Sequence, residues 1–189
     1  MEKLKKTFKS FLYLTLMALF LTGCRNKEDA VVLPVAIKPE VPSIILEDHH
    51  YFLDKLEQVT AYQDSTGYAA RKLFEVMEYH FREEEEYVFP PLGILPLLAK
   101  GNFPEDSKEI ILLTEKFREN SAVMLAEHQM ITHLLGEMML AAEKENHQEL
   151  IGFDEELQKH AALEEELLFP MVLVIGEYLK QKHGEIGEE

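Results

Sequence analysis

Apolar residues recur every three or four positions along most of the chain, which is the spacing of amphipathic helices. Four runs show this pattern, and each apolar stripe contains a histidine. The stripes consist of Ile45, His49, Phe52, Leu56 and Val59; Leu73, Met77, His80 and Glu84; Leu125, His128, Thr132, Leu135 and Met139; and Phe153, Leu157, His160, Glu164 and Leu167. No long stretch alternates with the two-residue period of a strand, so the chain predicts an all-α domain.

The helical pattern begins at residue 43 and is interrupted by one long connection. That connection, PPLGILPLLAKGNFPED at 90–106, is rich in proline and glycine and is expected to be irregular. Residues 106–144 predict one long helix or two helices joined near Asn120. The whole pattern predicts an up-and-down antiparallel four-helix bundle over residues 43–182, with an extra short C-terminal helical segment.

The first residues predict export and attachment to a membrane. A basic start and twelve uncharged residues lead to LTGC, which is typical of a bacterial lipoprotein signal peptide over residues 1–23. Cys24 would then be lipidated, and residues 24–42, with three prolines, would form a linker. The alternative is an uncleaved N-terminal anchor in which Cys24 has no role. Both alternatives place the domain outside the cytoplasm, in the cell envelope and tethered to a membrane.

Composition excludes several kinds of chemistry. Cys24 is the only cysteine, so a chain lipidated there has no disulfide, zinc–thiolate site or cysteine nucleophile. The formal charge of −16 becomes −19 when residues 1–23 are removed, because they carry four lysines and one glutamate. Such a surface repels nucleic acid, and membrane contact is expected through the lipid anchor.

The histidines in the stripes follow a repeated motif. HFREEEEYVFP, residues 80–90, and HAALEEELLFP, residues 160–170, share a His-x-x-x-Glu pair and a closing Phe-Pro. A single stripe histidine precedes each repeat, 31 residues before His80 and 32 residues before His160. A buried carboxylate is costly unless it is paired or binds a cation. One pair alone would be compatible with a satisfied core contact, but the repetition favours a metal site formed by His49, His80, Glu84, His128, His160 and Glu164.

The donor set indicates which metals fit. Four imidazoles and two carboxylates are too many for one tetrahedral zinc, and imidazole disfavours calcium and magnesium. The set suits two metal ions about 3.5 Å apart. Two iron ions in a non-haem centre fit best, and manganese or a mixed pair is the alternative. The ferritin-like di-iron bundles use Glu-x-x-His, which is the reverse order and a different spacing.

The order and spacing of these six residues resemble the hemerythrin-like HHE cation-binding family, over residues 43–180 approximately. The resemblance implies a di-iron centre with an open side where dioxygen or nitric oxide binds. Oxygen-carrying hemerythrins have a fifth histidine at the position of Thr132, whereas His133 is rotated from it by about 100° on a helix. The chain therefore resembles the symmetric form with four histidines and two glutamates, which iron-centre repair proteins share.

The remaining histidines are expected to be outside the site. His50 would be a ligand only if its helix were rotated, His133 is expected on a polar face, and His147 and His183 are expected in solvent. Carboxylates next to the ligands could accept a hydrogen bond from a ligand imidazole. The candidates for this role are Glu85, Glu165, Asp48 and Glu127.

The sequence thus predicts a membrane-tethered di-iron protein that binds or senses a small gas ligand, dioxygen or nitric oxide, or performs modest redox chemistry with it. The alternatives are iron capture or donation outside the cytoplasm, iron-centre repair, or a bundle that binds no metal. No nucleophile or phosphate-binding loop indicates an enzyme, and no feature indicates the redox partner.

Overall fold

A computed structural model describes residues 38–104 and 106–187. The predicted signal peptide, Cys24 and nearly all of the predicted linker lie outside these residues. The long helices are α2 (Ser43–Thr60), α3 (Ser65–Glu83), α5 (Lys108–Glu145), α6 (Phe153–Leu163) and α7 (Phe169–Gly187). Shorter helical segments are η1 (Glu84–Val88), η2 (Pro90–Ile94), α4 (Leu95–Leu98), η3 (Gln148–Leu150) and η4 (Glu164–Leu168). No β-strand occurs in the described part, which confirms the all-α prediction.

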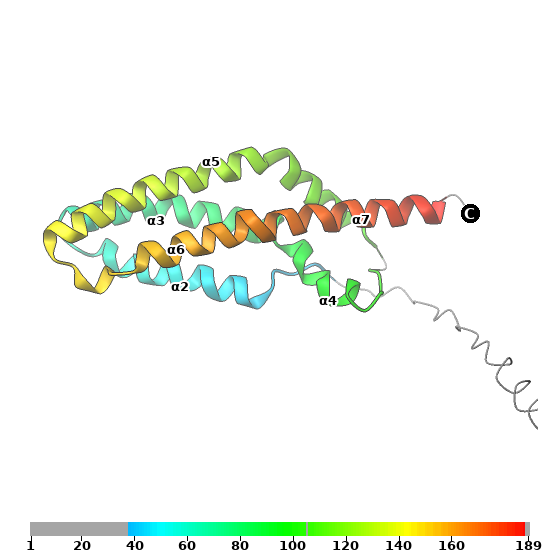
Figure 1. Ribbon diagram of the computed structural model, residues 1–189, viewed down its shortest axis with the longest axis horizontal. Helices are drawn as coiled ribbons and strands as arrows, with labels where there is room; N and C mark the ends of the chain where they lie inside the picture. Colours follow the sequence, from blue (N-terminus) through cyan, green and yellow to red (C-terminus); the bar gives the residue numbers. More distant parts are fainter. Residues whose placement is uncertain (1–37, 105, 188–189) are drawn as a thin grey trace, which may run out of the picture. The chain divides into compact units, whose positions relative to one another are not determined.

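Figure 1 shows α2, α3, α5 and the α6–η4–α7 run lying side by side as the four members of a bundle. The fourth member is continuous, because α6 passes through η4 directly into α7. The α2–α3 and α5–α6 connections lie at one end of the bundle. The α4 connection and the outer part of α7 lie at the opposite end.

The connection at 90–106 is more ordered than its composition indicates. It contains the 3-10 helix η2 and the four-residue helix α4, and prolines occupy the first positions of both. Proline fixes φ near the helical value, and it lacks the backbone N–H that would have no acceptor in the first turn of a helix. It therefore occurs at the start of helices as well as interrupting them. The prediction of an irregular segment was therefore wrong for residues 90–98.

Residues 108–145 form one uninterrupted helix, which decides between the two alternatives for this region. Asn120 does not break it, because its side-chain amide donates to the carbonyl of Lys116 at 2.8 Å. The helix ends at Asn146, whose φ of 64° places it in the left-handed region where asparagine is tolerated. Among the described residues, no helix is both long and apolar enough to cross a membrane.

The buried stripes agree with the sequence pattern in three helices and differ in α5. Every predicted stripe residue of α2 is buried, and so are Leu73 and Met77 of α3. In the second half of α5 the buried face is shifted by one residue at several positions, and consists of Met124, His128, Ile131, Leu135, Met138 and Ala142. Leu125 and Thr132, which are exposed, were therefore assigned wrongly, and Met139 is only partly buried. Each has an apolar neighbour one step earlier, and those neighbours continue the alternating four- and three-residue steps.

Two π-helical turns distort the second and fourth members of the bundle. The backbone N–H of Phe89 donates to the carbonyl of Glu84, and that of Phe169 donates to the carbonyl of Glu164. The proline after each phenylalanine cannot donate to a carbonyl in the preceding turn, which favours a wider turn there. The extra residue rotates the following positions, so Phe169 is buried and Leu167, predicted in the buried stripe, is 49% exposed.

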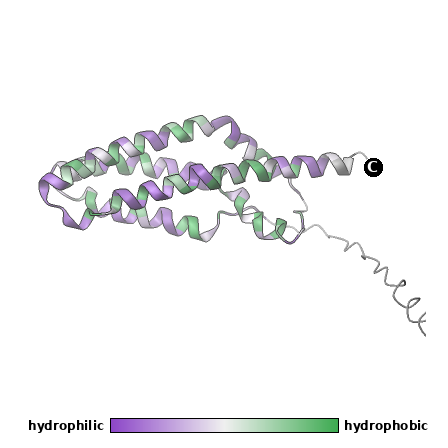
Figure 2. Ribbon diagram, viewed as in Figure 1, coloured by the Kyte–Doolittle hydropathy of each residue, from purple (hydrophilic) through white to green (hydrophobic). Residues whose placement is uncertain are grey.

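Apolar side chains form two clusters along the bundle. One lies toward the α2–α3 and α5–α6 connections and includes Phe52, Leu73 and Leu135. The other lies toward α4 and α7 and includes Phe117 and Val172. The helices are amphipathic, with hydrophobic and hydrophilic residues interleaved along each ribbon in Figure 2. The predicted metal ligands belong to neither cluster.

The packing of α7 on α5 yields a stability prediction. A Cβ added to Gly176 would approach Thr114 Cβ at 2.7 Å, and Thr114 is fully buried. We expect Gly176→Ala to lower the free energy of unfolding by about 1–3 kcal/mol, the usual cost of overpacking. Gly136, in the middle of α5, has no atom within 4 Å of an added Cβ. Gly136→Ala should therefore raise the free energy of unfolding by about 0.5–1 kcal/mol. Urea denaturation of both variants tests the pair, and equal effects would contradict this packing.

Candidate metal centre

Six ionisable side chains meet in the middle of the bundle, between the four helical members. They are His49 of α2, His80 of α3, Glu84 of η1, His128 of α5, His160 of α6 and Glu164 of η4. All six are buried, and the most exposed is His160 at 8%. The structure therefore brings together every residue that the sequence predicts as a metal ligand.

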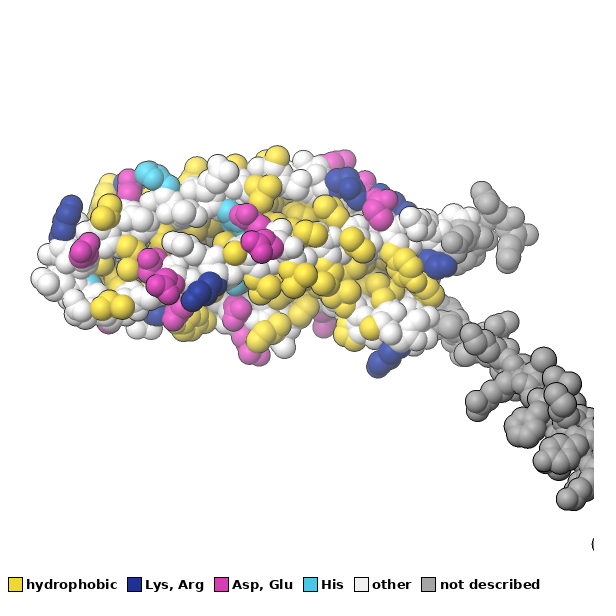
Figure 3. Space-filling model, viewed as in Figure 1, with side chains coloured by type: hydrophobic (Ala, Val, Ile, Leu, Met, Phe, Trp, Pro, Cys, Tyr) yellow, Lys and Arg dark blue, Asp and Glu magenta, His cyan; other side chains and the backbone are white. Residues whose placement is uncertain are grey.

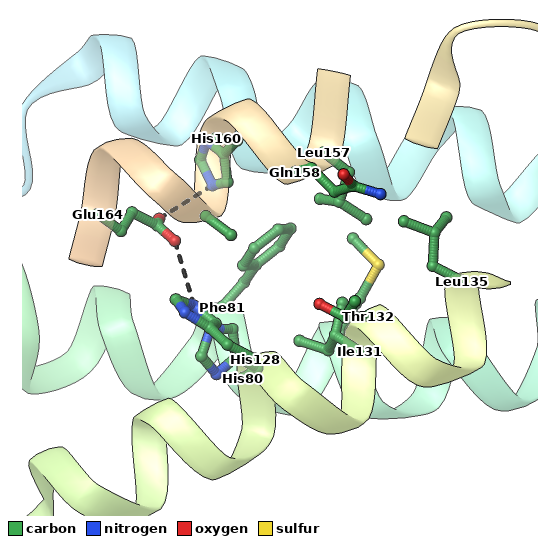
Figure 4. A pocket seen from close by; sticks show the side chains of 12 residues that line it. His80, Phe81, His128, Ile131, Thr132, Leu135, Leu157, Gln158, His160 and Glu164 are labelled. Carbon is green, nitrogen blue, oxygen red and sulfur yellow. Dashed lines mark ion pairs between the residues drawn. The ribbon is translucent and has the colours of Figure 1, made fainter. Parts of the chain in front are cut away.

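Glu164 faces three of the imidazoles. Its Oε1 atom lies 2.9 Å from His160 Nε2, and its Oε2 atom lies 3.3 Å from His128 Nε2. Figure 4 shows both contacts, with the carboxylate between the two rings. His49 Nε2 is 3.6 Å from Glu164 Oε1.

Glu84 faces the imidazoles from the other side of the centre. Its Oε1 atom lies 3.4 Å from His80 Nε2 and 4.0 Å from His128 Nε2, and its Oε2 atom lies 3.5 Å from His49 Nε2. All four histidines thus direct Nε2 toward the carboxylates. Nε2 carries a lone pair when the imidazole is neutral and protonated at Nδ1, which is the form that binds a metal.

The Nδ1 atom of each histidine points outward to a second carboxylate. These contacts are His49–Glu85 at 2.8 Å, His80–Glu127 at 2.9 Å, His128–Glu165 at 2.7 Å and His160–Asp48 at 3.7 Å. The first three are hydrogen bonds and the last is a longer ion pair. A carboxylate on Nδ1 fixes the ring orientation and raises the basicity of Nε2. Three of the four acids that the sequence nominated for this role accept such a hydrogen bond, whereas Asp48 lies beyond hydrogen-bond distance of His160.

Seven buried polar atoms of the centre have no hydrogen-bond partner among the described residues. They are Nε2 of His49, His80 and His160, and both carboxylate oxygens of Glu84 and of Glu164. Buried polar atoms are almost always satisfied, so such a group needs an explanation. Three nitrogen lone pairs and four carboxylate oxygens directed at one small volume are what cations satisfy. The residues present therefore fit a metal centre.

The ligand atoms divide into two overlapping groups. One group contains His80, Glu84, His128 and Glu164, and the other contains His49, His160 and Glu164. Within each group the atoms lie within 4.8 Å of one another. Glu164 belongs to both groups, so its carboxylate connects them.

The electrostatics of the centre are strained without a cation. Burial and the charge of Glu164 raise the pKa of Glu84. Burial alone would also raise the pKa of Glu164, but close imidazoles, His128 first among them, hold its pKa well below the usual value. Burial opposes charge on His80, yet Glu84 and Glu127 raise its pKa to about 9. Protons thus take the place of positive charge that metal ions would supply.

Aromatic rings close the centre on the side of α2. Phe81 stacks on His49 at a centroid distance of 4.0 Å, and Phe52 lies 5.0 Å from His160. Phe169 stacks on His128 at 5.6 Å. These rings hold the imidazoles in place and exclude water from their faces.

A small cavity of about 20 Å³ reaches the centre from the side of α5 and α6. His80, His128, His160 and Glu164 form its inner part, and the rest of its wall is mostly aliphatic. Thr132 and Gln158 line it as well, and both are exposed at the surface. No residue of α2 lines this cavity. Its size suits a very small molecule, because about 10–15 Å³ of such space already holds one water.

Two of the other histidines lie where the sequence indicates. His50 is exposed, so α2 is not rotated to present it to the centre. His133 has a side chain that is 74% exposed, and it pairs with Glu137 one turn later in α5. Thr132 lies at the cavity opening, and the described centre contains no fifth histidine.

His147 is not in free solvent, which corrects the prediction for that residue. Its Nε2 lies 2.8 Å from Asp64 and its Nδ1 lies 2.9 Å from Glu149. The neighbouring Glu145 accepts hydrogen bonds from the backbone N–H groups of Ser65 and Thr66 at 3.0 and 2.9 Å. These contacts join the α2–α3 and α5–α6 connections. Sequence reasoning missed them because the partners are about 80 residues apart.

The four residues Asp64, Glu145, His147 and Glu149, here called the loop-end cluster, differ from the centre in one respect. Their carboxylates already accept hydrogen bonds from helix N-termini or neighbouring side chains, and Asp64 Oδ1 caps α3 through the N–H of Gly67 at 2.9 Å. Although three of them could contact one cation, the cluster is satisfied without it. We interpret it as a structural connection between two loops.

Comparison with known proteins gives one result. The profile of the hemerythrin HHE cation binding domain matches residues 41–172, which include all six residues of the centre and their four outer carboxylates. No curated protein and no solved structure gives a significant match.

The loop-end cluster predicts a pH-dependent stability. Hydrogen bonds to Asp64 and Glu149 raise the pKa of His147 in the folded protein. Protonated His147 therefore contributes fully to stability below its unfolded-state pKa of about 6.5, and this contribution is lost as pH rises through its folded-state pKa. The difference in Tm between the parent and His147→Gln should be largest near pH 6 and shrink toward pH 8, with melting followed by circular dichroism. His133→Gln is the exposed control. A difference independent of pH would show that His147 is neutral in the cluster.

Proposed function

We propose that this chain, which belongs to the hemerythrin HHE cation-binding domain family, holds two iron ions between its four helices. The observation that carries the proposal is the set of seven unsatisfied buried atoms on His49, His80, His160, Glu84 and Glu164. The overlapping groups of ligand atoms support two ions rather than one. A donor set of imidazole nitrogens and carboxylate oxygens favours iron, and manganese or a mixed pair is the alternative.

The outer carboxylates support this assignment. Hydrogen bonds from Nδ1 to an acid orient His49, His80 and His128, and Asp48 lies 3.7 Å from Nδ1 of His160, so the Nε2 lone pairs already point at the same volume before any ion binds. Such preorganisation reduces the cost of binding and fixes the tautomer. When bound, iron supplies a redox-active centre with affinity for dioxygen and nitric oxide.

The cavity supports a small neutral gas as the ligand. Its apolar wall, with Ile131, Leu135 and Leu157, favours an apolar ligand, and its volume of about 20 Å³ suits a small one. Dioxygen or nitric oxide would reach His80 and His128 from the opening near Thr132. The protein would bind or sense the gas, or perform modest redox chemistry with it.

The proposed location is the cell envelope. The basic and apolar start and the LTGC segment support cleavage after residue 23 and a lipid on Cys24, which would tether the domain outside the cytoplasm of a bacterium.

Metal analysis of purified variants tests the ligand set. His80→Ala and Glu164→Ala each remove one buried donor and should weaken iron affinity by at least about 10–100-fold. Loss of a residue that only hydrogen-bonds to a metal ligand typically has an effect of this size. His133→Ala is the matched control, because it removes an exposed imidazole from α5 and should retain the iron content of the parent. Circular dichroism of each variant establishes that the bundle is folded. Iron loss in His133→Ala alone would place the metal on the outside of α5.

Optical spectra test the gas ligand. Iron-loaded protein prepared without oxygen should change its visible spectrum when dioxygen or nitric oxide is added, and Thr132→Phe should slow this change by filling the cavity opening. Unchanged spectra with two irons bound would favour iron capture or donation instead.

Removal of iron should lower stability but leave the helices. An ion that binds only the folded state adds about 2.7 kcal/mol at a hundredfold excess over its Kd. The two apolar clusters are independent of the metal, so the metal-free protein should keep its helical circular dichroism spectrum. Equal melting temperatures with and without iron would place the metal outside the centre.

A further inference from the structure

One face of the fourth bundle member, from the end of α6 through η4 into α7, is apolar although it is exposed to solvent. Leu163, Leu167, Pro170, Val174 and Tyr178 follow one another in steps of four, three, four and four residues. Leu163 is 46% exposed, Leu167 49% and Val174 66%. The opposite face of α7 buries Phe169, Val172, Ile175 and Leu179. α7 thus has apolar side chains on two of its faces, and a second apolar face on an amphipathic helix is normally covered.

The apolar face continues from α7 to the connection that follows α4. The ring of Phe103 stacks on Tyr178 at a centroid distance of 5.8 Å. Leu95, Leu98 and Phe103 are only partly buried. Figure 3 shows hydrophobic side chains gathered over this part of the bundle, whereas acidic side chains gather nearer the opposite end. Contiguous exposed apolar surface of this kind marks an interaction surface.

Charge is distributed unevenly between the ends of the bundle. The segments at the α4 and α7 end, residues 38–42, 88–118 and 167–187, carry seven Lys and Arg and seven Asp and Glu. The other segments, 43–87 and 119–166, carry six Lys and Arg and 23 Asp and Glu. The α4 and α7 end is therefore close to neutral. It is the one part of this acidic domain that an anionic surface would not repel.

The described domain begins at the same end. Pro39 is buried, and an added Cβ on Gly93 of η2 would collide with the backbone of Glu40, so residues 39–40 pack closely against η2. η2 in turn contacts α7. Thirteen residues separate Cys24 from Lys38, which reach at most about 50 Å when extended and about 20 Å as a flexible coil. A lipid on Cys24 would thus hold this end near the bilayer.

We propose that the face of the α6–η4–α7 run defined by Leu163, Leu167, Pro170, Val174 and Tyr178 lies on the surface of a lipid bilayer. The apolar stripe enters the boundary between headgroups and acyl chains, as in helices that lie in the membrane plane. Tyr178 lies at headgroup depth, where tyrosine is favoured. The acidic part of the domain faces away from the lipid. A short tether to a lipid on Cys24 would keep this face at a high local concentration of lipid, which favours a bilayer over a second copy of the chain as its partner.

Single tryptophans test this surface, because the chain contains none. Val174→Trp places an indole on the proposed face, and Ile151→Trp places one at the acidic end, where Ile151 is 72% exposed. Each full-length variant is reconstituted in phosphatidylcholine vesicles with brominated acyl chains. The indole of Val174→Trp should shift its emission to shorter wavelength and lose most of its intensity, whereas that of Ile151→Trp should change little. Both variants should keep the iron content of the parent, so this test is independent of the metal centre.

Three results would overturn the proposal. Protein that does not float with the vesicles would show that neither tether nor face binds lipid. Equal quenching of the two indoles would show that the bundle has no preferred face toward the bilayer. A shift of the Val174→Trp emission that appears without vesicles and grows with protein concentration would show that a second copy of the chain covers the face.

Discussion

The whole arrangement depends on the burial of two carboxylates and four imidazoles inside an apolar bundle. Unpaired buried charges cost several kcal/mol each, so the chain must compensate for them. Imidazoles surround Glu84 and Glu164, and a second carboxylate stands behind each imidazole. Those outer acids are partly exposed, with 42% for Glu165 and 51% for Asp48. The outer acids thus connect the buried charged groups to the surface, where water solvates the outer carboxylates.

The outer acids also explain why the motif occurs twice. The single histidines, His49 and His128, use the acid that follows the ligand glutamate of their own half of the chain. The paired histidines, His80 and His160, use the acid that precedes the single histidine of the other half. Each half of the bundle therefore completes the surroundings of a ligand in the other half. Neither half has a satisfied site alone, which couples formation of the centre to assembly of all four helices.

The sequence predicted which six side chains meet in the centre, because they recur at helical spacing on faces that are otherwise apolar. The four outer acids were also recognisable, since each is adjacent in sequence to a ligand or to a stripe histidine. The π turns at Glu84 and Glu164 were not predicted, although the Phe-Pro that closes each repeat was the available signal. Missing them put Leu167 on the wrong face. In α5, neighbouring apolar residues such as Met124 and Leu125 made the stripe ambiguous by one step, and only packing against the other helices decides between them.

The four-histidine centre is symmetric in its ligands but not in its surroundings. Phe52 and Phe81 pack on the rings of His49 and His160, so the α2 side is closed by aromatic contacts. The α5 and α6 side has the cavity, with Thr132 at its opening. A histidine at position 132 would place an imidazole at that opening, whereas threonine leaves it free. The difference from a five-histidine centre therefore concerns the wall of the cavity as well as the number of ligands, because Thr132 lines the cavity together with His80 and His128.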